Sequence, residues 1–468
     1  MKLYRYIYIA LSASLLTSCG LYKNYERNEE QVQAEVQHLY RDPMAENAPL
    51  TVTDSVCFGN TPWREVFTDP VLQSHIEKAL AQNGDIAHAD LTLQQAEVGL
   101  RINKLAFLPQ IAFTPSGTLA KAFIDGTNTT ATYEFPIAAS WQLDAFGLLR
   151  NQKKQGEMTV LQAQAAKQAT QTAIICAMAN MYYSLQMLDE QLSTTKATLA
   201  LWDKNITAME AMMQAGMTNA ASVSSAKAQH LQIQTTIPAI EGNIREVENA
   251  MCLIMDETPH AISRNAFTAD GFPASFSTGM PIQLLEARPD VKIAELTLTK
   301  AFYGVNAAKA SFYPQITISG QGAWTNSLGG IIMNPGKFLA AGVASLTQPI
   351  FAQGKLKGQL EIAEIAQKQA ELDFSDALLK AGSEVSNALA AYNTAVEQTR
   401  LCEQQVAELE KANEATDFLF HNGNTTSYLE TLTAQMNLLN GRLALINDRY
   451  AKVQAVVSLY QALGGGRE

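Results

Sequence analysis

Charged residues and long apolar segments are both scarce in this sequence. Charged side chains make up 17% of the 468 residues, below the ~25% of an average globular protein. After a short apolar run at residues 7–16, no stretch approaches the ~20 apolar residues that a membrane-spanning helix needs. If the protein crosses a membrane, we therefore expect it to do so as a closed β-barrel, in which the strands satisfy one another's backbone hydrogen bonds.

The sequence also lacks the usual signs of catalysis, metal binding and nucleic-acid binding. Its six histidines are scattered without metal-ligand spacing, and there is no phosphate-binding glycine loop or nucleophile elbow. Cys57, Cys176, Cys252 and Cys402 form no CxxC pair, and Cys176 lies in an apolar run typical of a buried thiol. The net charge of −11, with no Lys/Arg-rich run, disfavours nucleic acid. We therefore expect no enzyme activity, no metal or cofactor, and no disulfide.

One stretch of the sequence occurs twice. Residues 96–111 and 301–316 share Ala, Gly, Lys and Phe at matched positions and end in Pro-Gln-Ile, with Pro314 lying 205 residues after Pro109. This spacing far exceeds the ~20–50 residues of a solenoid repeat, which indicates that one large supersecondary unit has been duplicated. In each copy a helix-forming run meets a proline, which cannot continue a helix, and alternating β-forming residues follow. Each copy therefore predicts a helix-to-strand junction.

Each junction is followed by a predicted β-hairpin and then by two long helices. The four expected strands cover residues 109–119, 132–143, 312–324 and 338–349, with turns at 125–128, 326–330 and 334–336. The expected helices cover residues 69–108 with a break near Gly84, 145–213, 220–257, 355–420 and 427–462. At 1.5 Å per residue the longest would reach ~100 Å, too long for a compact domain. Because the smallest membrane barrels have about eight strands, four strands per chain require several chains.

The last helix carries the clearest coiled-coil pattern. Its apolar residues alternate at spacings of four and three: Leu432, Met436, Leu439, Leu443, Ile446, Tyr450, Val453, Val457 and Tyr460. A heptad seam of this length predicts antiparallel packing against a neighbouring helix. Gly216 and Gly423 follow the two outgoing helices and suit C-terminal caps that require a positive φ.

The first residues have the form of a secretion signal. Lys2 and Arg5 precede the apolar run, which ends in Leu-Thr-Ser before Cys19. This arrangement resembles the lipobox of bacterial lipoproteins, in which the Cys is lipidated and becomes the mature N-terminus. An ordinary signal with an incidental Cys is the alternative. The expected organisation is a signal peptide at 1–18, a lipidated N-terminal arm at 19–68, a first repeat at 69–256, a connection at 257–288 and a second repeat at 289–468.

With these features in order, the chain resembles the TolC-like outer-membrane efflux duct family, in its lipoprotein (NodT/OprM-like) branch. The resemblance covers nearly the whole chain after Cys19. Its carriers are the lipobox and residues 141–147 (WQLDAFG), 287–291 (ARPDV), 311–316 (SFYPQI), 348–351 (QPIF) with Gly354, and 422–423 (NG) with 427–430 (SYLE). The resemblance implies a mainly α fold with a membrane β-barrel. Three chains of a homotrimer would contribute four strands each to a twelve-stranded barrel, continued by a long periplasmic α-helical barrel.

The same resemblance implies the outer-membrane channel of a tripartite efflux system in a Gram-negative bacterium. Such a lipid-anchored duct conducts drugs or other small molecules passively to the outside, and its partners are a periplasmic adaptor (membrane fusion) protein and an inner-membrane RND-type pump. One alternative is an exit duct for type I protein secretion. Another is a structural periplasmic lipoprotein that never inserts into the membrane.

The resemblance also assigns residues to sites. The candidate docking residues at the periplasmic tip, which an adaptor would grip, are Ala215, Gly216, Met217, Gly423 and Asn424, although simple helix caps would explain the glycines as well. Glu430 is the candidate lumen or gate residue, with a solvent-exposed outer position as the alternative. Thr433 stands where many relatives carry Asp, which argues against a double acidic ring. Trp141 and Trp324 are candidate membrane-interface aromatics, unless they merely pack on neighbouring residues.

Overall fold

The computed structural model describes residues 24–27, 58–121, 129–267, 288–328, 331–422 and 428–466. The chain forms two compact units. Unit 1 contains the described residues within Met1–Glu29, Leu91–Gln164 and Ile293–Asp376. Unit 2 contains those within Glu30–Asp90, Ala165–Lys292 and Ala377–Glu468. Four helices contribute residues to both units.

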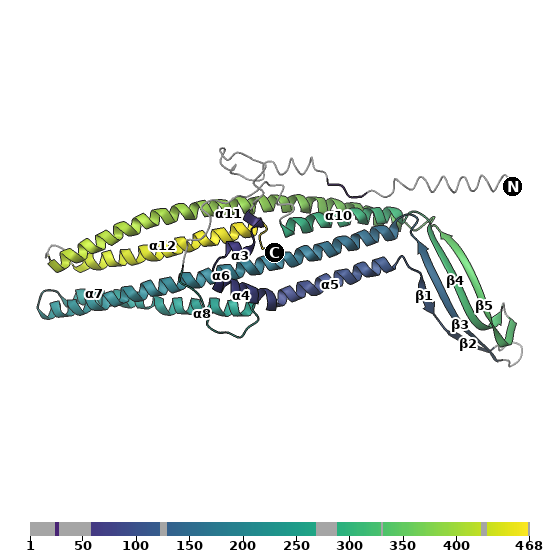
Figure 1. The fold of residues 1–468 in the computed structure, drawn as a ribbon, viewed down its shortest axis with the longest axis horizontal. Helices are drawn as coiled ribbons and strands as arrows, with labels where there is room; N and C mark the ends of the chain where they lie inside the picture. Colours follow the sequence, from purple (N-terminus) through teal and green to yellow (C-terminus); the bar gives the residue numbers. More distant parts are fainter. Residues whose placement is uncertain are drawn as a thin grey trace. The chain divides into compact units, whose positions relative to one another are not determined.

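In unit 1, two helices lead into strands and two helices follow strands (Figure 1). Helix α5 (Gly84–Leu105) precedes β1 (Gln110–Phe113) and β2 (Ser116–Lys121), and α10 (Pro289–Ala310) precedes β4 (Gln315–Leu328). Helix α6 (Leu148–Gln214) follows β3 (Thr129–Leu143), and α11 (Lys355–Asn422) follows β5 (Ile331–Thr347). The two predicted helix-to-strand junctions are therefore confirmed, with a proline just before each first strand.

The strands form one antiparallel sheet in the order β1-β3-β4-β5, with β2 also paired to β3 (Figure 1). The hairpins of the two halves join through β3 and β4, which pair from Glu134 with Thr325 to Leu143 with Ile316. The strand expected at 109–119 is interrupted between β1 and β2. The cause is Pro115, which has no N–H to donate to a ladder. The register of pairing with β3 is nevertheless the same on both sides of the interruption.

The second hairpin is longer than expected, because residues 326–328 and 334–336, predicted as turns, belong to β4 and β5. A bulge lies between Thr325 and Ser327, and the Asn326 side chain continues the pairing there. Its Oδ1 accepts from the Tyr133 N–H at 2.8 Å, and its Nδ2 donates to the Ala131 carbonyl at 2.9 Å. The side-chain amide thus takes the place of a backbone donor and acceptor in the strand pairing. The turn prediction was wrong here because Asn was counted only as a turn-forming residue.

Unit 2 is helical. Besides parts of the four shared helices it contains η2 (Phe58–Asn60), α3 (Trp63–Val66), α4 (Pro70–Gln82), α7 (Ala220–Gln234), α8 (Thr236–Ile254) and α12 (Tyr428–Ala462). Asp69 caps the N-terminus of α4, since its carboxylate accepts from the Val71 N–H at 2.8 Å, and Pro70 occupies the first helical position. Asn83 separates α4 from α5, as the sequence predicted.

The single helix expected at 220–257 is instead two helices, α7 and α8, which meet at Thr235. Pro238 lies in the first turn of α8. It has no N–H for the carbonyl of Gln234, four residues earlier, so the helical hydrogen-bond ladder is broken at this point.

The heptad seam of α12 is confirmed as the inner face of that helix. Leu432 and Leu439 share a buried cluster with Trp202 of α6, and Ile446 shares one with Leu188 of α6. The later residue of α12, Ile446, thus contacts the earlier residue of α6, Leu188, so the two helices are antiparallel. Cys176 of α6 is buried, as predicted, and burial raises the pKa of its thiol to about 12.

Candidate functional site

The sheet has one apolar face and one polar face. Side chains alternate between the faces, and the register aligns apolar positions across strands, with Trp141 opposite Ile318 and Phe135 opposite Trp324. The apolar face carries side chains that are all more than one third exposed: Ile111, Phe113, Leu119, Phe135, Ile137, Trp141, Ile318, Trp324, Phe338 and Leu346. An exposed apolar surface of this extent marks contact with a membrane or another protein.

The opposite face of the sheet is mostly polar, with Leu339 and Val343 of β5 as exposed apolar exceptions. It carries Gln142 and Thr317 as one cross-strand pair, Ser140 and Ser319 as the next, and Gln321, whose amide donates to the Glu134 carboxylate at 3.1 Å. A sheet with one apolar and one polar face separates an apolar phase from water, as strands of outer-membrane channels do.

Trp141 and Trp324 both lie on the apolar face, toward opposite ends of the sheet. Trp141 is near the end adjoining the helices, where its Nε1–H donates to the Phe107 carbonyl at 2.8 Å. Trp324 lies six residues along β4 from the partner of Trp141, a separation of about 20 Å at the rise of a β-strand. This distance is close to the height of the apolar band between the aromatic girdles of outer-membrane proteins.

Both edges of the sheet are open among the residues that the structure describes. Strand β5 pairs with β4 alone, and β1 and β2 pair with β3 alone. Soluble proteins usually shorten, charge or cover such edges, because unpaired strands attract other strands. Here β5 pairs over most of its 17 residues and its free edge is uncovered.

Two helices of unit 1 also present exposed apolar seams. Helix α5 packs on α6, where Gly156 faces Leu100 and Asn103, and the far side of α5 exposes apolar residues at heptad spacing. These residues are Leu91, Val98, Ile102 and Leu105. Helix α11 exposes Ile362, Ile365 and Leu372 in the same way. Heptad seams of this kind pack against a neighbouring helix, and none of the helices that the structure describes covers these two seams.

The turn after α6 is a Schellman cap. Gly216 has φ +73°, its N–H donates to the Met213 carbonyl, and the Met217 N–H donates to the Met212 carbonyl at 2.9 Å. No atom lies within 4 Å of the place where a Cβ would stand on Gly216, and the Met217 side chain is 66% exposed. The turn is therefore well defined and its surface is accessible. Its sequence-predicted counterparts Gly423 and Asn424 lie outside the described residues.

Glu430 lies in the first turn of α12 and is exposed. A carboxylate is favourable there, since it interacts with the positive end of the helix dipole. Cys19, the candidate lipidation site, lies outside the described residues.

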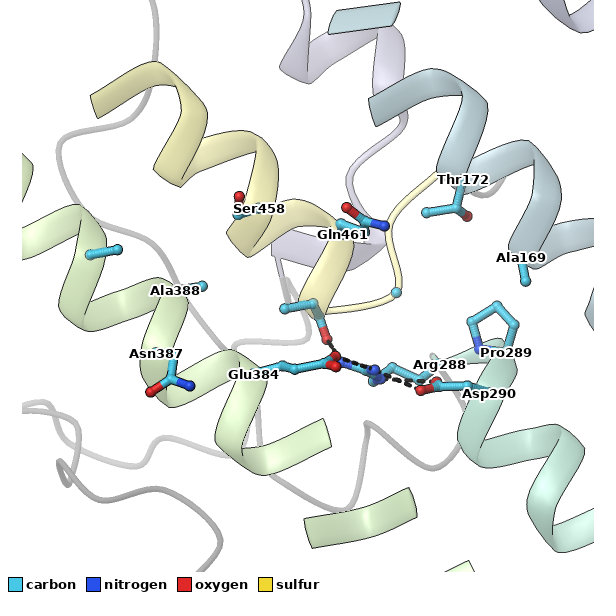
Figure 2. A pocket seen from close by; sticks show the side chains of 13 residues that line it. Ala169, Thr172, Arg288, Pro289, Asp290, Glu384, Asn387, Ala388, Ser458 and Gln461 are labelled. Atoms are coloured by element: carbon cyan, nitrogen blue, oxygen red, sulfur yellow. Dashed lines mark hydrogen bonds and ion pairs between the residues drawn. The ribbon is translucent and has the colours of Figure 1, made fainter. Parts of the chain in front are cut away.

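The best-defined polar cluster surrounds Arg288, in an open cavity of about 620 Å³ in unit 2 (Figure 2). Its guanidinium donates to Asp290 at 3.0 and 2.7 Å, to Glu384 at 2.6 Å and to the carbonyl of Ala462 at 2.8 Å. Burial by itself would raise the pKa of Asp290, but the hydrogen bonds and charge of Arg288 hold that pKa below its usual value. The cluster ties the start of α10 to α11 and to the end of α12. In the sequence Arg288 stands out only as part of the ARPDV motif, because its partner Glu384 is 96 residues away.

The described residues contain no group of three or more His, Cys, Asp or Glu side chains placed to hold a metal ion. In the same part of the chain, no helix is both long and apolar enough to span a membrane.

The sequence profile of the outer membrane efflux protein family matches residues 75–255 and 280–465. The chain is 26% identical to the cation efflux system protein CusC of Escherichia coli K12, over 97% of this chain and 98% of CusC. A crystal structure of CusC matches with a TM-score of 0.81, covering 87% of this chain and 95% of that one. The toluene efflux pump outer membrane protein TtgC of Pseudomonas putida is 27% identical over 98% of this chain and 95% of its own. The probable outer membrane lipoprotein SilC of Salmonella typhimurium is 26% identical over 87% and 89%.

The described residues combine an exposed apolar sheet face, open sheet edges and long paired helices, which are features of an outer-membrane channel. The family that the chain matches consists of transport channels and not of enzymes. The chain belongs to the outer membrane efflux protein family. It is the outer-membrane channel of an efflux system, as the sequence predicted.

Proposed function

We propose that three copies of this chain form the efflux duct. The observation that carries the proposal is the sheet with one exposed apolar face and two unpaired edges. Counting β1 and β2 as one interrupted strand, three such sheets joined edge to edge give twelve strands, within the range of outer-membrane barrels. Joining them satisfies the edge backbone groups, which a lipid environment cannot do. We further propose that residues 69–256 and 289–468 are two structural repeats joined by the connection at 257–288.

The helical seams support the same assembly. Val98 lies seven residues before the end of α5, and Ile362 lies seven residues after the start of α11, so the two are at matching distances from the sheet. Strands β1 and β5, which adjoin these helices in the chain, are at opposite edges of the sheet. When β1 of one copy meets β5 of the next, the exposed seam of α5 therefore approaches the exposed seam of α11.

Disulfide crosslinking tests this arrangement. We expect the double variant Val98→Cys/Ile362→Cys to yield dimers and trimers on oxidation, seen on a non-reducing gel. The matched control is Leu231→Cys/Leu253→Cys, which also replaces two exposed apolar residues but lies in α7 and α8 of unit 2. Monomers alone from the first variant, in protein that conducts ions, would refute the proposed pairing of α5 with α11.

We propose that Ala215, Gly216 and Met217, with Gly423 and Asn424, form the periplasmic tip to which an adaptor protein docks. The rigid cap and the exposed Met217 side chain support this role, because a helical hairpin of an adaptor would find both shape and apolar surface there. The inner-membrane RND-type pump then supplies the energy, and the duct conducts passively.

We propose that Glu430 faces the lumen near the tip. Three carboxylates in a narrow pore would favour cations over anions. The test is single-channel conductance in a planar bilayer for the wild type, Glu430→Ala and the control Glu364→Ala, which removes an exposed carboxylate of α11 in unit 1. We expect only Glu430→Ala to lose cation preference or to gain conductance. A conducting pore indifferent to Glu430→Ala would keep the duct and discard this residue.

We propose that Cys19 carries the lipid anchor and that Trp141 and Trp324 lie at the two membrane interfaces. The name of SilC, a probable outer membrane lipoprotein, supports the first proposal, and the separation of the two tryptophans supports the second. The names of CusC and TtgC, which concern cations and toluene, support small molecules as cargo over type I protein secretion. Deletion of the gene is expected to sensitise the cell to toxic small molecules without a defect in protein secretion.

A further inference from the structure

We propose that a basic girdle, formed by Lys104, Arg150, Lys309 and Lys355, binds the phosphate groups of anionic phospholipids at the periplasmic surface of the outer membrane. Lys104 and Lys309 lie one residue before the ends of α5 and α10, while Arg150 and Lys355 lie in the first turns of α6 and α11. These four helix ends all adjoin the sheet in unit 1 (Figure 1). The inference rests on the proposed function, since it takes the sheet to be the inserted part.

The duplication repeats the girdle. Lys309 lies 205 residues after Lys104, which is the offset of the repeated Pro-Gln-Ile stretches. The outgoing helices α6 and α11 begin 207 residues apart, each directly after a glycine with positive φ, so Arg150 corresponds to Lys357 and Lys355 is a further cation in the first turn of α11. Other positions on the same turns have diverged, such as Arg101, which corresponds to Asn306. Both halves therefore have a cation at the end of the incoming helix and at the start of the outgoing one.

Helix electrostatics accounts for only part of this pattern. Lysine is favourable at the C-terminal ends of α5 and α10, where the helix dipole is negative. At the N-terminal end of α6 the Asp144 carboxylate, which accepts from the N–H groups of Leu149 and Arg150 at 2.9 Å, offsets the positive end of the dipole. The first turn of α11 has no acidic residue, so the dipole disfavours Lys355 there, and its charge indicates a negative group outside the chain.

The girdle lysines also lack internal counter-charges. Among the described residues, Lys104, Lys309 and Lys355 make no ion pair and are exposed. Lys153 and Lys154 differ, because both pair with Glu157, and we leave them out of the girdle. Three lysines without ion pairs among the described residues thus lie at helix ends that adjoin the sheet, in a chain whose net charge is −11.

The girdle lies beside the apolar face of the sheet. The Nε1–H of Trp141 donates to the carbonyl of Phe107, three residues after Lys104, and Ile111 and Phe113 begin the apolar face just beyond. Basic residues next to an aromatic residue and an apolar band match the order of headgroups, interface and acyl chains in a leaflet.

The N-terminal arm indicates which face of α10 points outward. Arg27 donates to Glu295 at 2.6 and 2.7 Å, and the Tyr25 ring lies 5.8 Å from that of Phe302. Lys309 lies seven residues after Phe302 and so on the same side of the helix. Tyr25 is six residues from Cys19, so the proposed lipid anchor can lie at most about 20 Å from this face of α10. The face that carries Lys309 is therefore the outer one.

Fluorescence quenching of Trp141 tests the proposal in the full-length protein. The protein, with Trp324→Phe to remove the second exposed tryptophan, is reconstituted in phosphatidylcholine vesicles containing brominated phosphatidylglycerol or, separately, brominated phosphatidylcholine. We compare it with the variant Lys104→Gln/Arg150→Gln/Lys309→Gln/Lys355→Gln. The control variant is Lys204→Gln/Lys292→Gln/Lys368→Gln/Lys380→Gln, which removes four charges from exposed positions outside the helix ends that adjoin the sheet.

We expect phosphatidylglycerol to quench Trp141 more strongly than phosphatidylcholine in the parent and in the control. The relative affinity for phosphatidylglycerol falls roughly fivefold for each girdle charge removed, and it also falls with added salt. Equal quenching by the two lipids in the parent, or an unchanged preference in the girdle variant, would overturn the girdle alone. If the girdle residues faced the lumen, the girdle variant would keep the lipid preference of the parent and change the ion selectivity of the channel. This result would also overturn the proposed girdle. Absence of quenching by either lipid would instead refute the insertion of the sheet.

Discussion

Replacing Arg288 is expected to loosen the end of α12. The guanidinium is only 7% exposed and is the donor to the carbonyl of Ala462, the last residue of that helix. Leaving this carbonyl without its partner costs about 1–3 kcal/mol. Asp290 and Glu384 are 49% and 43% exposed, so water screens their ion pairs, and each adds no more than about 1 kcal/mol. We therefore expect Arg288→Met to lower the free energy of local opening by about 3 kcal/mol.

Hydrogen exchange measured by mass spectrometry gives this quantity directly. A loss of about 3 kcal/mol raises the opening equilibrium of residues 455–466 roughly a hundredfold. Arg400→Met is the matched control, because Arg400 also donates two hydrogen bonds to a carboxylate, that of Glu397, but the pair is 52% and 57% exposed. We expect it to change exchange less than about threefold. Arg288→Lys keeps the charge without the forked geometry and should fall between the two.

Equal exchange in Arg288→Met and Arg400→Met would refute the reasoning. It would mean that burial of the guanidinium does not strengthen the cluster, and that the packing of α12 alone holds its end in place.

Three further perturbations follow from local geometry. Gly216→Ala places a Cβ on a residue with φ +73°, so the helix cap should weaken by about 1 kcal/mol. Trypsin should then cleave the variant faster than the wild type after Lys204 and Lys227. The control Gly242→Ala, within helix α8, should not change the cleavage rate. Asn326→Ala removes two hydrogen bonds to β3 at a cost of about 2 kcal/mol, and the trimer should dissociate at a lower temperature in detergent; an unchanged temperature would argue against a pairing role. Because Arg288 depresses the pKa of Asp290, the carboxylate stabilises the fold above about pH 4, its ordinary range, and this contribution is lost as pH falls through the lowered pKa. Thermal melts of wild type and Asp290→Asn should therefore differ at pH 7, and the difference should shrink only as the pH falls below the ordinary range of an aspartate, about pH 4.

The helices and strands of this protein could be predicted from its sequence, because they depend on local interactions along the chain. Pro109 and Pro314 cannot donate a helical hydrogen bond, so the helical segment before each of them must end. In the structure β1 and β4 begin directly after these two prolines. The heptad of α12 required only that an apolar stripe be buried, and the structure buries it against α6. The cap at Gly216 followed from the need for a positive φ.

The joining of these elements depended on the tertiary structure. The two hairpins become one sheet through β3 and β4, and the Asn326 amide extends that pairing only because Tyr133, 193 residues away, is its neighbour. Arg288 likewise finds Glu384 and the end of α12 only after the helices have packed. The four cations of the girdle are unremarkable in the sequence, where they are single basic residues up to about 250 positions apart. The fold brings four helix ends of alternating direction to one end of the sheet, and long-range contacts of this kind have no local signal in the chain.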